Sequence, residues 1–471
     1  MTQDDRGAAA AAKKLPYSGY YNRPLQGNDP LLTEVGPGTP GGEYLRRYWH
    51  PFMLASELGE LPVAVRLLGE DLVVFRDKSG RLGLLHKHCA HRGVSLEFGI
   101  IAERGIRCCY HGWHFDVDGT ILDTPAEPET SPIRSRFCQG AYRVREEHGL
   151  IFTYMGPPEF TPEFPVYDGF RVPDTVVAPF KISLPCNWLQ IVENAADPIH
   201  NAFLHAIMSV SGRQFSPAFK VLPALDFVDT PLGFLSMATR KVGEFVFIRA
   251  GELMLPNIAQ FPAGNNTLEK ESVRAFSTTT RWAVPVDDHN SLYIGASHWE
   301  AGGNPRSKRL DDYGVGKMPL IGQTADRPYK ERQVEPGDYD AVVSPGPIAN
   351  RKAEHLGTSD RGVALVRRML ANAIGAVRDG NVPALPRLYP GDTPVRTYAH
   401  ETVLRVPVAG ALSDRQSLAD FGRRAANVFI EMDDVPAERR DEIARTRIAQ
   451  ILHEACARAN DATQQQAPVR A

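Results

Sequence analysis

Two short segments bring cysteine and histidine together in a metal-ligand pattern. The first reads Cys89-Ala-His91 and the second reads Cys108-Cys-Tyr-His111, with residues 92–107 between them. Each segment offers one thiolate and one imidazole. Structural zinc is one interpretation, but zinc fingers usually group the two cysteines in one pair and the two histidines in another. The mixed pattern favours a two-iron cluster in which both thiolates bind one iron and both imidazoles bind the other.

A second concentration of ligands reads Asn187-Trp-Leu-Gln-Ile-Val-Glu-Asn-Ala-Ala-Asp197-Pro-Ile-His200-Asn-Ala-Phe-Leu-His205. With one added carboxylate, His200 and His205 would form a 2-His-1-carboxylate triad, which leaves positions open on ferrous iron for O2 and substrate. Two histidines on an amphipathic helix are more often packed or exposed groups. The two residues alone are therefore a weak signal.

The spacing of these two histidines places a condition on the backbone. Five residues at 3.6 per turn put the side chains about 140° apart on a straight helix. Binding to one ion therefore requires a bend, a π-bulge or a helix end between His200 and His205. Asp197-Pro198 also permits a plain interpretation, in which a helix restarts with Asp as its cap and Pro in its first turn.

The elements that must position these ligands change along the chain. Residues 1–44 are rich in Gly, Pro and polar residues and predict an N-terminal arm. The next region predicts a small antiparallel β domain over 45–160, closed by a cluster of prolines. Its clearest short β-runs are 63–68, 72–75, 81–85 and 149–154.

The rest of the chain mixes strands with amphipathic helical patterns at 187–206, 360–379 and 436–457. We expect a second domain over 161–457 and a disordered tail at 458–471. The C-terminal helix could serve as an interface or as a lid.

Composition excludes several classes of protein. Of 471 residues, 43% are hydrophobic, which is enough for a substantial core. The net charge of −3 argues against a nucleic-acid partner held by a broad basic field. No apolar run approaches the ~18 residues of a membrane span, and the N-terminus lacks an apolar signal region. We therefore expect a cytoplasmic protein whose six cysteines bind metal or remain buried thiols.

The segments Cys-Ala-His-Arg-Gly and Cys-Cys-Tyr-His-Gly-Trp resemble the two loops of Rieske [2Fe–2S] proteins. The resemblance implies that Cys89, His91, Cys108 and His111 bind the cluster. Cys109 occupies a position where the family often has proline. Because Cys108 gives the family's Cys-x-x-His spacing, we interpret Cys109 as a packed, unligated thiol. No second cysteine follows His91, so a disulfide between the loops is not expected, and the oxygenase and ferredoxin branch is favoured.

The second segment is similar to the Asn-Trp…Glu-Asn-x-x-Asp-x-x-His-x4-His motif of Rieske non-haem iron oxygenase α subunits. The similarity implies that His200 and His205 bind a mononuclear iron. It also implies that Asp197 hydrogen-bonds an iron-ligating histidine and a cluster-ligating histidine, His91 or His111, of a neighbouring subunit. Such a carboxylate would orient both imidazoles and link the two redox centres.

The third iron ligand comes from a later resemblance. Gly337-Asp338-Tyr-Asp340-Ala-Val-Val-Ser-Pro-Gly346-Pro-Ile is similar to the phthalate dioxygenase-like group, in which an aspartate lies eight residues before the Gly-Pro-Ile glycine. Counting back from Gly346 gives Asp338, with Asp340 as the alternative. Either aspartate could instead simply face water in a polar loop.

These resemblances span about residues 45–380 and imply an α+β fold. An N-terminal antiparallel β Rieske domain would precede a C-terminal helix-grip-like catalytic domain, whose antiparallel sheet and helices surround an apolar pocket. The family implies a homotrimer in which each chain holds one [2Fe–2S] Rieske cluster and one mononuclear non-haem Fe(II).

The activity implied is that of a terminal oxygenase component. It would use O2 and electrons from a separate NAD(P)H-dependent reductase, with or without a ferredoxin, to mono- or dioxygenate an aromatic substrate, aromatic carboxylates included. The sequence does not identify an arginine that would bind such a carboxylate. The alternatives are an O- or N-demethylase, a Rieske electron carrier and a zinc-binding structural protein. A carrier needs only a small domain, and roughly 300 residues follow the first one.

Overall fold

The small β domain contains six antiparallel strands in the order β1-β10-β9-β4-β3-β2. The strands are β1 Trp49–Leu54, β2 Val63–Leu67, β3 Glu70–Arg76, β4 Leu82–His86, β9 Ala141–Glu147 and β10 Leu150–Tyr154. The computed structural model describes residues 16–22, 26–171, 174–209, 215–262, 268–274, 277–300, 309–381, 394–408, 410–432, 435 and 437–465.

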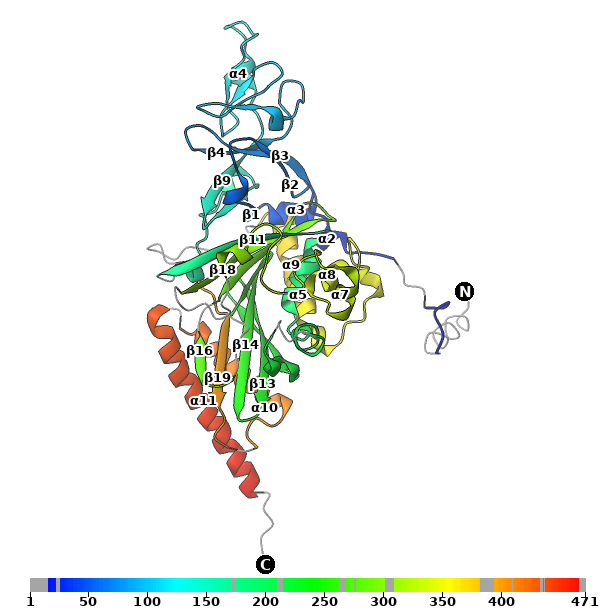
Figure 1. The fold of residues 1–471 in the computed structure, drawn as a ribbon, viewed down its shortest axis with the longest axis vertical. Helices are drawn as coiled ribbons and strands as arrows, with labels where there is room; N and C mark the ends of the chain where they lie inside the picture. Colours follow the sequence, from blue (N-terminus) through cyan, green and yellow to red (C-terminus); the bar gives the residue numbers. More distant parts are fainter. Residues whose placement is uncertain are drawn as a thin grey trace, which may run out of the picture.

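A second, four-stranded sheet is inserted between β4 and β9, in the order β5-β6-β7-β8. Its strands are β5 Ile100–Ile101, β6 Ile106–Arg107, β7 His114–Phe115 and β8 Ile121–Asp123. Helix α4 (Ile133–Arg136) follows β8 and lies at the opposite end of the molecule from the C-terminal helix α11 (Ala437–Gln465) (Figure 1). The inserted sheet belongs to the part of the chain that carries both Cys/His segments.

A larger antiparallel sheet dominates the second part of the chain. Its main path runs β11-β18-β17-β15-β14-β13-β12, and β19 pairs with both β14 and β16. The strands are β11 Thr175–Leu184, β12 Ala224–Thr230, β13 Gly233–Val242, β14 Phe245–Met254, β15 Ile258–Phe261, β16 Ser272–Arg274, β17 Thr279–Pro285, β18 Ser291–Glu300 and β19 His400–Arg405.

Helices cover the two faces of this sheet, and residue alternation along β14 shows how. Val246 and Ile248 lie in the core formed with α10 (Arg415–Ile430) and α11, whereas Phe247 packs with Phe219 on the opposite face. Helices α5 (Trp188–Ala196) and α9 (Arg361–Arg378) pack in a separate hydrophobic core, called the main core below. The predicted α+β class, with a β-rich first domain and an antiparallel catalytic sheet, is confirmed. None of the helices in the described residues is long and apolar enough to cross a membrane.

Two predicted terminal segments differ from the structure. Helices α2 (Pro30–Thr33) and α3 (Pro40–Leu45) lie in the predicted arm, and their residues Leu32 and Tyr44 are buried in the main core, so this part of the arm is packed. Helix α11 continues through Gln465 because the alanines and glutamines after 457 are compatible with a helix. Residues 1–15 and 466–471 lie outside the described residues.

The junction between the two β-rich parts is apolar and continuous. The Trp282 ring on β17 lies 5.6 Å from the Phe152 ring on β10 and 5.7 Å from the Tyr167 ring. Trp282 is only 1% exposed, and residues from both parts share one core. The division at residue 160 therefore stays a prediction, because the packing does not separate two cores there.

Replacing Trp282 with alanine should destabilise the whole chain. The large buried ring bridges both sheets, so its removal should lower the free energy of unfolding by about 3–5 kcal/mol. Urea unfolding followed by circular dichroism measures this change. Leu61→Ala, at a side chain that is 75% exposed, is the control and should change it by about 0.5 kcal/mol or less. A loss below about 1 kcal/mol for Trp282→Ala would contradict the bridging role.

Candidate metal centres and active site

The two Cys/His loops adopt the same turn. In each loop the N–H of the cysteine, Cys89 or Cys108, donates to the carbonyl five residues later, at 2.9 and 2.8 Å. A glycine four residues after each cysteine donates its N–H back to the cysteine carbonyl. These glycines, Gly93 and Gly112, have φ of +76° and +74°, which glycine adopts without strain. The repeated turn presents one thiol and one imidazole in equivalent ways.

The four side chains converge, with the sulfurs inside and the imidazoles nearer the surface. Cys89 and Cys108 are 4% and 3% exposed, while His91 and His111 are half-buried and their ring centroids lie 4.7 Å apart. The His91 ring also stacks on Trp113 at 4.5 Å. Burial, together with the adjacent Cys108 thiol, raises the pKa of Cys89 to about 11. A bound cation would reverse this effect and stabilise both thiolates.

The spread of these four ligands favours a cluster over a single ion. Tetrahedral zinc brings its ligand atoms within roughly 3.3–3.8 Å of one another. Among the described residues, the one group of three or more possible ligands whose atoms all lie within 4.8 Å is in the other domain. The Cys/His set is therefore more widely spaced than one zinc ion requires. It fits a [2Fe–2S] cluster, with thiolates at one iron and imidazoles at the other.

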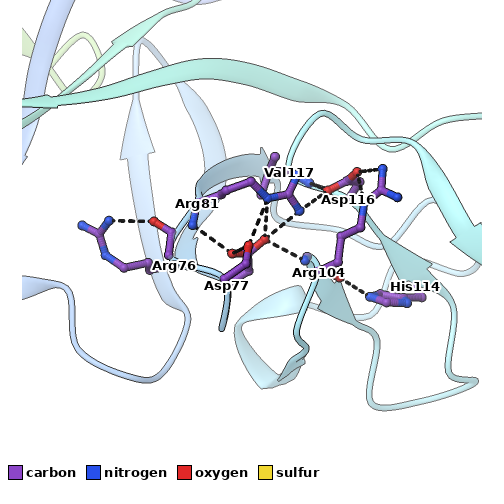
Figure 2. A network of polar contacts seen from close by, with 10 residues as sticks. Arg76, Asp77, Arg81, Arg104, His114, Asp116 and Val117 are labelled. Atoms are coloured by element: carbon purple, nitrogen blue, oxygen red, sulfur yellow. Dashed lines mark hydrogen bonds and ion pairs between the residues drawn. The ribbon is translucent and has the colours of Figure 1, made fainter.

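An ion network around two buried carboxylates fixes the inserted sheet that carries the second loop (Figure 2). The Arg81 guanidinium donates to both Asp77 and Asp116 at 2.7 Å, and Arg104 donates to Asp116. Asp77 also accepts the N–H of Gly105. Burial raises the pKa of both carboxyls, but these hydrogen bonds outweigh it, and both pKa values lie below their ordinary range. The strands that flank the loop are thereby anchored to the turn between β3 and β4.

Cys109 differs from its predicted environment. Its side chain is exposed, so the prediction of a packed thiol is wrong. Nothing in the described structure places Cys109 beside the other ligands.

The backbone break that the histidine spacing requires is present. Asn187 caps α5 by accepting the N–H of Leu189, and the helix ends at Ala196. A short helix, α6 (His200–Ala202), follows and passes directly into a π-helical turn, η5 (Phe203–Ile207). His200 and His205 therefore lie on different local geometries, with ring centroids 5.3 Å apart.

Side-chain hydrogen bonds dock the start of α5 against distant segments. Asn187 donates to the carbonyl of Thr33 at 2.8 Å, and the Trp188 indole donates to the carbonyl of Leu32. Gln190 donates to the carbonyl of Val342 at 2.7 Å and accepts the N–H of Ala349. Helix α5, which precedes His200 and His205, is thus held to the N-terminal residues and to the segment that follows Asp338.

An ion network holds the following turn of α5. Glu193 accepts from Arg351 and from Arg367, the latter at 2.6 Å, and Glu354 also pairs with both arginines. All four side chains are at least partly buried. Because each charge has an opposite partner, the network orients α5 without leaving an unpaired buried ion.

His200, His205 and Asp338 form the one compact ligand group noted above. The Asp338 Oδ1 atom lies 3.1 Å from His205 Nε2 and 3.6 Å from His200 Nε2. Asp338 is the first residue of α8 (Asp338–Val343). Asp340 points elsewhere, accepting from Arg332 at 2.6 Å and from the N–H of Gly337. Of the two predicted carboxylates, the structure brings Asp338 to the histidines.

The second oxygen of Asp338 is held by a residue that the sequence did not single out. Gln323 donates to Asp338 Oδ2 at 2.6 Å, while Asn194 of α5 donates to Oδ1 at 3.2 Å. Gln323 reaches this position because Gly322 and Gly337 approach so closely that a Cβ on Gly337 would lie 2.2 Å from the Gly322 Cα. Burial raises the pKa of Asp338, but His205, His200 and Gln323 lower it more strongly, to well below its ordinary value.

Asp197 lies at the end of α5, beside the first histidine. Its Oδ1 accepts the N–H of Ile199 at 2.8 Å, and its Oδ2 lies 3.7 Å from His200 Nδ1. The prediction that Asp197 caps a restarting helix with Pro198 in its first turn is wrong, because α6 begins at His200 after Ile199 and no side chain caps it. Burial lowers the pKa of His200, but Asp197 and Asp338 raise it more, so the net shift is upward. Asp197 is 25% exposed, so it is accessible from outside the chain.

A cavity of about 100 Å³ contains the three ligands. This is smaller than the roughly 150 Å³ cavity that holds benzene in an engineered protein, so its enclosed part fits one ring at most. Aromatic rings line it, namely Phe215, Phe219, Phe261, Trp299 and Tyr313. Three arginines, Arg240, Arg249 and Arg281, line it as well. The predicted apolar pocket therefore also contains charged side chains.

Sequence reasoning missed these arginines because they look like ordinary strand residues. The signal that could have found them is period-two alternation, which places Ala238 and Arg240 on one face of β13. The register then pairs Ala238 with Arg249 on β14. That register depends on the sheet topology, which the sequence pattern alone did not provide.

Comparisons with known proteins agree with this architecture. Residues 48–138 match the family model of the Rieske [2Fe-2S] domain, and residues 153–219 match the model described as LigXa C-terminal domain like. Dicamba monooxygenase has a similar fold, with a TM-score of 0.54 at 17% identity, over 72% of this chain and 99% of that chain.

Relatives of known name are similar over most of their length. The chain is 43% identical over 465 residues to the tert-butanol monooxygenase / tert-amyl alcohol desaturase oxygenase subunit of Aquincola tertiaricarbonis, covering 93% of this chain and 97% of that protein. It is 39% identical to the phenoxybenzoate dioxygenase subunit alpha of Ectopseudomonas oleovorans, over 78% and 90%. It is 32% identical to the phthalate 4,5-dioxygenase oxygenase subunit of Pseudomonas putida, over 74% and 86%.

The chain belongs to the Rieske non-haem iron oxygenases and is similar to the oxygenase, or α, subunits of that family. It is an oxidoreductase of this family, whose members carry a Rieske [2Fe–2S] cluster and a mononuclear non-haem iron.

The two adjacent cysteines of the second loop should respond differently to substitution. Cys108→Ser should abolish the visible absorption of the cluster, because the buried thiolate would be a ligand. Cys109→Ser, the matched control, should keep the absorption and the iron content of the wild type. Visible spectra of both purified variants test this. The reverse pattern would assign the cluster to Cys109.

Gln323→Leu should weaken iron binding without disturbing the Rieske cluster. Removing the amide frees Asp338 Oδ2, and loss of such an outer hydrogen bond typically lowers metal affinity 10–100-fold. Iron retention during dialysis against a chelator measures the change. Gln323→Glu, which restores an acceptor but not a donor, should not rescue it. Unchanged retention in Gln323→Leu would show that Gln323 does not position the ligand.

Proposed function

We propose that this chain is the terminal component of an oxygenase system that hydroxylates an aromatic substrate with O2 and electrons from a separate reductase. The observation that carries the proposal is the combination of two ligand sets in one chain. One is a Cys/His pair of loops with half-buried imidazoles, and the other is a 2-His-1-carboxylate group lining a ring-sized cavity.

The residues present fit the two groups that the family carries. Cys89, Cys108, His91 and His111 would hold the cluster, and His200, His205 and Asp338 would hold the iron. Two imidazoles and one carboxylate are the donor set of non-haem ferrous oxygenases, in which the iron activates O2 with electrons supplied through the cluster.

The chain's own residues prepare the site for this chemistry. Gln323 and Asn194 each donate to one oxygen of Asp338, which fixes the carboxylate and leaves Oδ1 directed at the histidines. The π-helical turn brings His205 beside His200. Within the described ranges three protein ligands converge, which would leave other positions on the iron to substrate and O2. Burial of His205, at 1% exposure, keeps bulk water from one side of the site.

Asp197 is proposed to connect the two centres across subunits. The loops of the first domain and helix α5 lie in different parts of the molecule (Figure 1). Asp197 contacts His200 from a partly exposed position, and His91 and His111 are half-buried. A homotrimer, in which the loops of one subunit approach Asp197 of the next, would join these surfaces. The carboxylate would then accept hydrogen bonds from an imidazole of each centre.

The aromatic rings of the cavity support an aromatic substrate. Relatives named for phenoxybenzoate and phthalate support the same class. The relative named for tert-butanol supports a small alcohol as the second candidate, because it is similar over nearly the whole chain. A bare electron carrier would make no use of the triad or of the cavity.

The proposal is tested by reconstitution with a generic NADH-dependent reductase. Benzoate, toluene, anisole and tert-butanol are supplied in turn, while O2 uptake and products are measured. We expect stoichiometric O2 uptake with a hydroxylated aromatic product. Formaldehyde from anisole would instead indicate demethylation, and turnover of tert-butanol alone would indicate the second candidate. Cluster reduction without O2 uptake on any substrate would contradict the oxygenase assignment of the site.

Asp197→Asn should separate metal binding from turnover. The amide keeps the acceptor for Ile199 but loses the charge beside His200, so coupling between the centres should fall. We expect full iron content and an unchanged cluster spectrum, with O2 uptake at least tenfold lower. Asp360→Asn, at the start of α9, is the control and should behave as wild type. Wild-type O2 uptake in Asp197→Asn would remove its proposed role.

A further inference from the structure

A buried glutamine outside the ligand motifs contacts the first Cys/His loop. Gln139 lies between α4 and β9 and is only 2% exposed. Its side-chain amide makes three hydrogen bonds to the backbone of the first loop. The Nε2 group donates to the carbonyls of His86 and His88 at 2.8 and 2.9 Å, and Oε1 accepts the N–H of Ala90 at 2.7 Å. Gln139 therefore holds the backbone on both sides of Cys89.

The orientation of this amide is determined by its partners. A glutamine side chain has two N–H donors and one carbonyl acceptor. In this site both donors meet carbonyls and the acceptor meets an N–H, so the opposite orientation would set the amide oxygen against two carbonyl oxygens. The main chain of Gln139 is fixed as well, because its N–H donates to the carbonyl of Gly119 at 2.8 Å. Both ends of the residue are thus held in place.

The contacts of Gln139 continue the pairing of β4 with β9 beyond the end of both strands. The N–H of His86, the last residue of β4, donates to the carbonyl of Gly140, which precedes β9. Alternate residues of an extended chain present their backbone groups to the same side, so the next groups on this edge belong to residues 88 and 90. The side-chain amide of Gln139 binds these groups in place of a peptide. The first loop is therefore attached to the six-stranded sheet.

The backbone that Gln139 holds determines what surrounds the Cys89 sulfur. Burial raises the pKa of the Cys89 thiol, and the backbone N–H groups of His91 and Arg92, which donate to its sulfur, lower it. Only Ala90 separates the peptide group that Gln139 binds from the peptide group that carries the His91 N–H. A change in the orientation of the first peptide would therefore turn the second away from the sulfur.

The second loop is supported in a different way. It lies between β6 and β7, which pair with each other. Arg107 of β6 also donates to the carbonyl of Gly112 at 2.7 Å and forms an ion pair with Asp123. The second loop is thus held by its own hairpin, whereas Gln139 supports the first loop from a segment about 50 residues later in the chain.

We infer that Gln139 is a positioning residue for the Rieske cluster and raises its reduction potential by fixing the backbone N–H groups that face Cys89. Hydrogen bonds to the ligand sulfurs are among the factors that set the potential of such clusters. They stabilise negative charge on sulfur, and the reduced cluster carries one more negative charge than the oxidised cluster. Loss of the Gln139 amide should therefore favour the oxidised form. The inference rests on the proposed function, in which Cys89 and His91 are cluster ligands, and adds a residue outside their motif.

Redox titration of the purified holoprotein, followed in the visible spectrum, tests this role without substrate or turnover. Gln139→Met keeps the approximate size of the side chain but removes both donors and the acceptor. We expect the variant to retain the cluster absorption. At the midpoint potential of the wild type, its ratio of reduced to oxidised cluster should be lower by roughly three- to tenfold, the effect of a few lost hydrogen bonds. The electron paramagnetic resonance signal of the reduced cluster should shift as well.

Thr153→Val is the matched control for a loss of stability alone. Thr153 is fully buried on β10 of the same domain, and its hydroxyl donates to the carbonyl of Arg143 on β9 at 2.9 Å. Its removal should lower the melting temperature, because a buried acceptor loses its side-chain donor. The potential and the resonance signal of the cluster should remain those of the wild type.

A wild-type potential in folded Gln139→Met would overturn the inference, as would an equal shift of the potential in Thr153→Val. A folded Gln139→Met protein that assembles no cluster, beside a control that does, would support the positioning role. Hydrogen exchange of the wild-type holoprotein is a second measurement that needs no variant. We expect slow exchange of the Ala90 N–H, and exchange at the rate of an unstructured chain would overturn the inference.

Failure of the inference is distinguishable from failure of the proposed function. A wild-type protein without the visible absorption of a [2Fe–2S] cluster would reject the proposed cluster, and the role of Gln139 with it. A wild type that has this absorption, together with an unchanged potential in Gln139→Met, would reject the role of Gln139 alone.

Discussion

The docking of helix α5 is the constraint on which the iron site depends. Its first turns are tied by Asn187, Trp188 and Gln190 to backbone carbonyls of segments remote in sequence, and Glu193 adds a paired ion network. These contacts fix the position of α5, which precedes the segment that carries both histidines. Since three ligands must meet within a few ångströms, a shift of this helix would separate both histidines from Asp338. The polar residues of the Asn187–His205 segment therefore position helix α5 as well as supply candidate metal ligands.

Charge pairing turns buried carboxylates into structural supports. In the first domain, Asp77 and Asp116 are buried but satisfied by Arg81, Arg104 and backbone donors, and the result is a rigid support for the second loop (Figure 2). In the cavity, the Nε atom of Arg281 is buried without a hydrogen bond, and its guanidinium stacks between Phe261 and Tyr293 instead. The rule that a buried ion needs a partner therefore accounts for the rigid scaffold of the first domain.

Local patterns and the family resemblance pointed to residues that the structure brings together, but not to the residues that surround them. The Cys-x-His and Cys-x-x-His spacing identified both loops, and helix geometry alone required the break that appears at η5. Counting from Gly346 pointed to Asp338, which the structure brings to the histidines. Gln323 and the arginines could not be found in this way, because they reach the site through a glycine–glycine contact and through strand register. Both depend on tertiary structure, as does the packing of α2 and α3 within the predicted arm.

If one chain holds two separate iron centres, His205 belongs to one of them only. Iron content and the visible spectrum of anaerobically purified wild type, beside His205→Ala, test it most directly. The account predicts a red-brown protein with about three irons per chain, falling to about two in the variant while the colour stays. A coloured protein whose iron content is unchanged by the substitution would contradict the account, as would a colourless protein containing zinc.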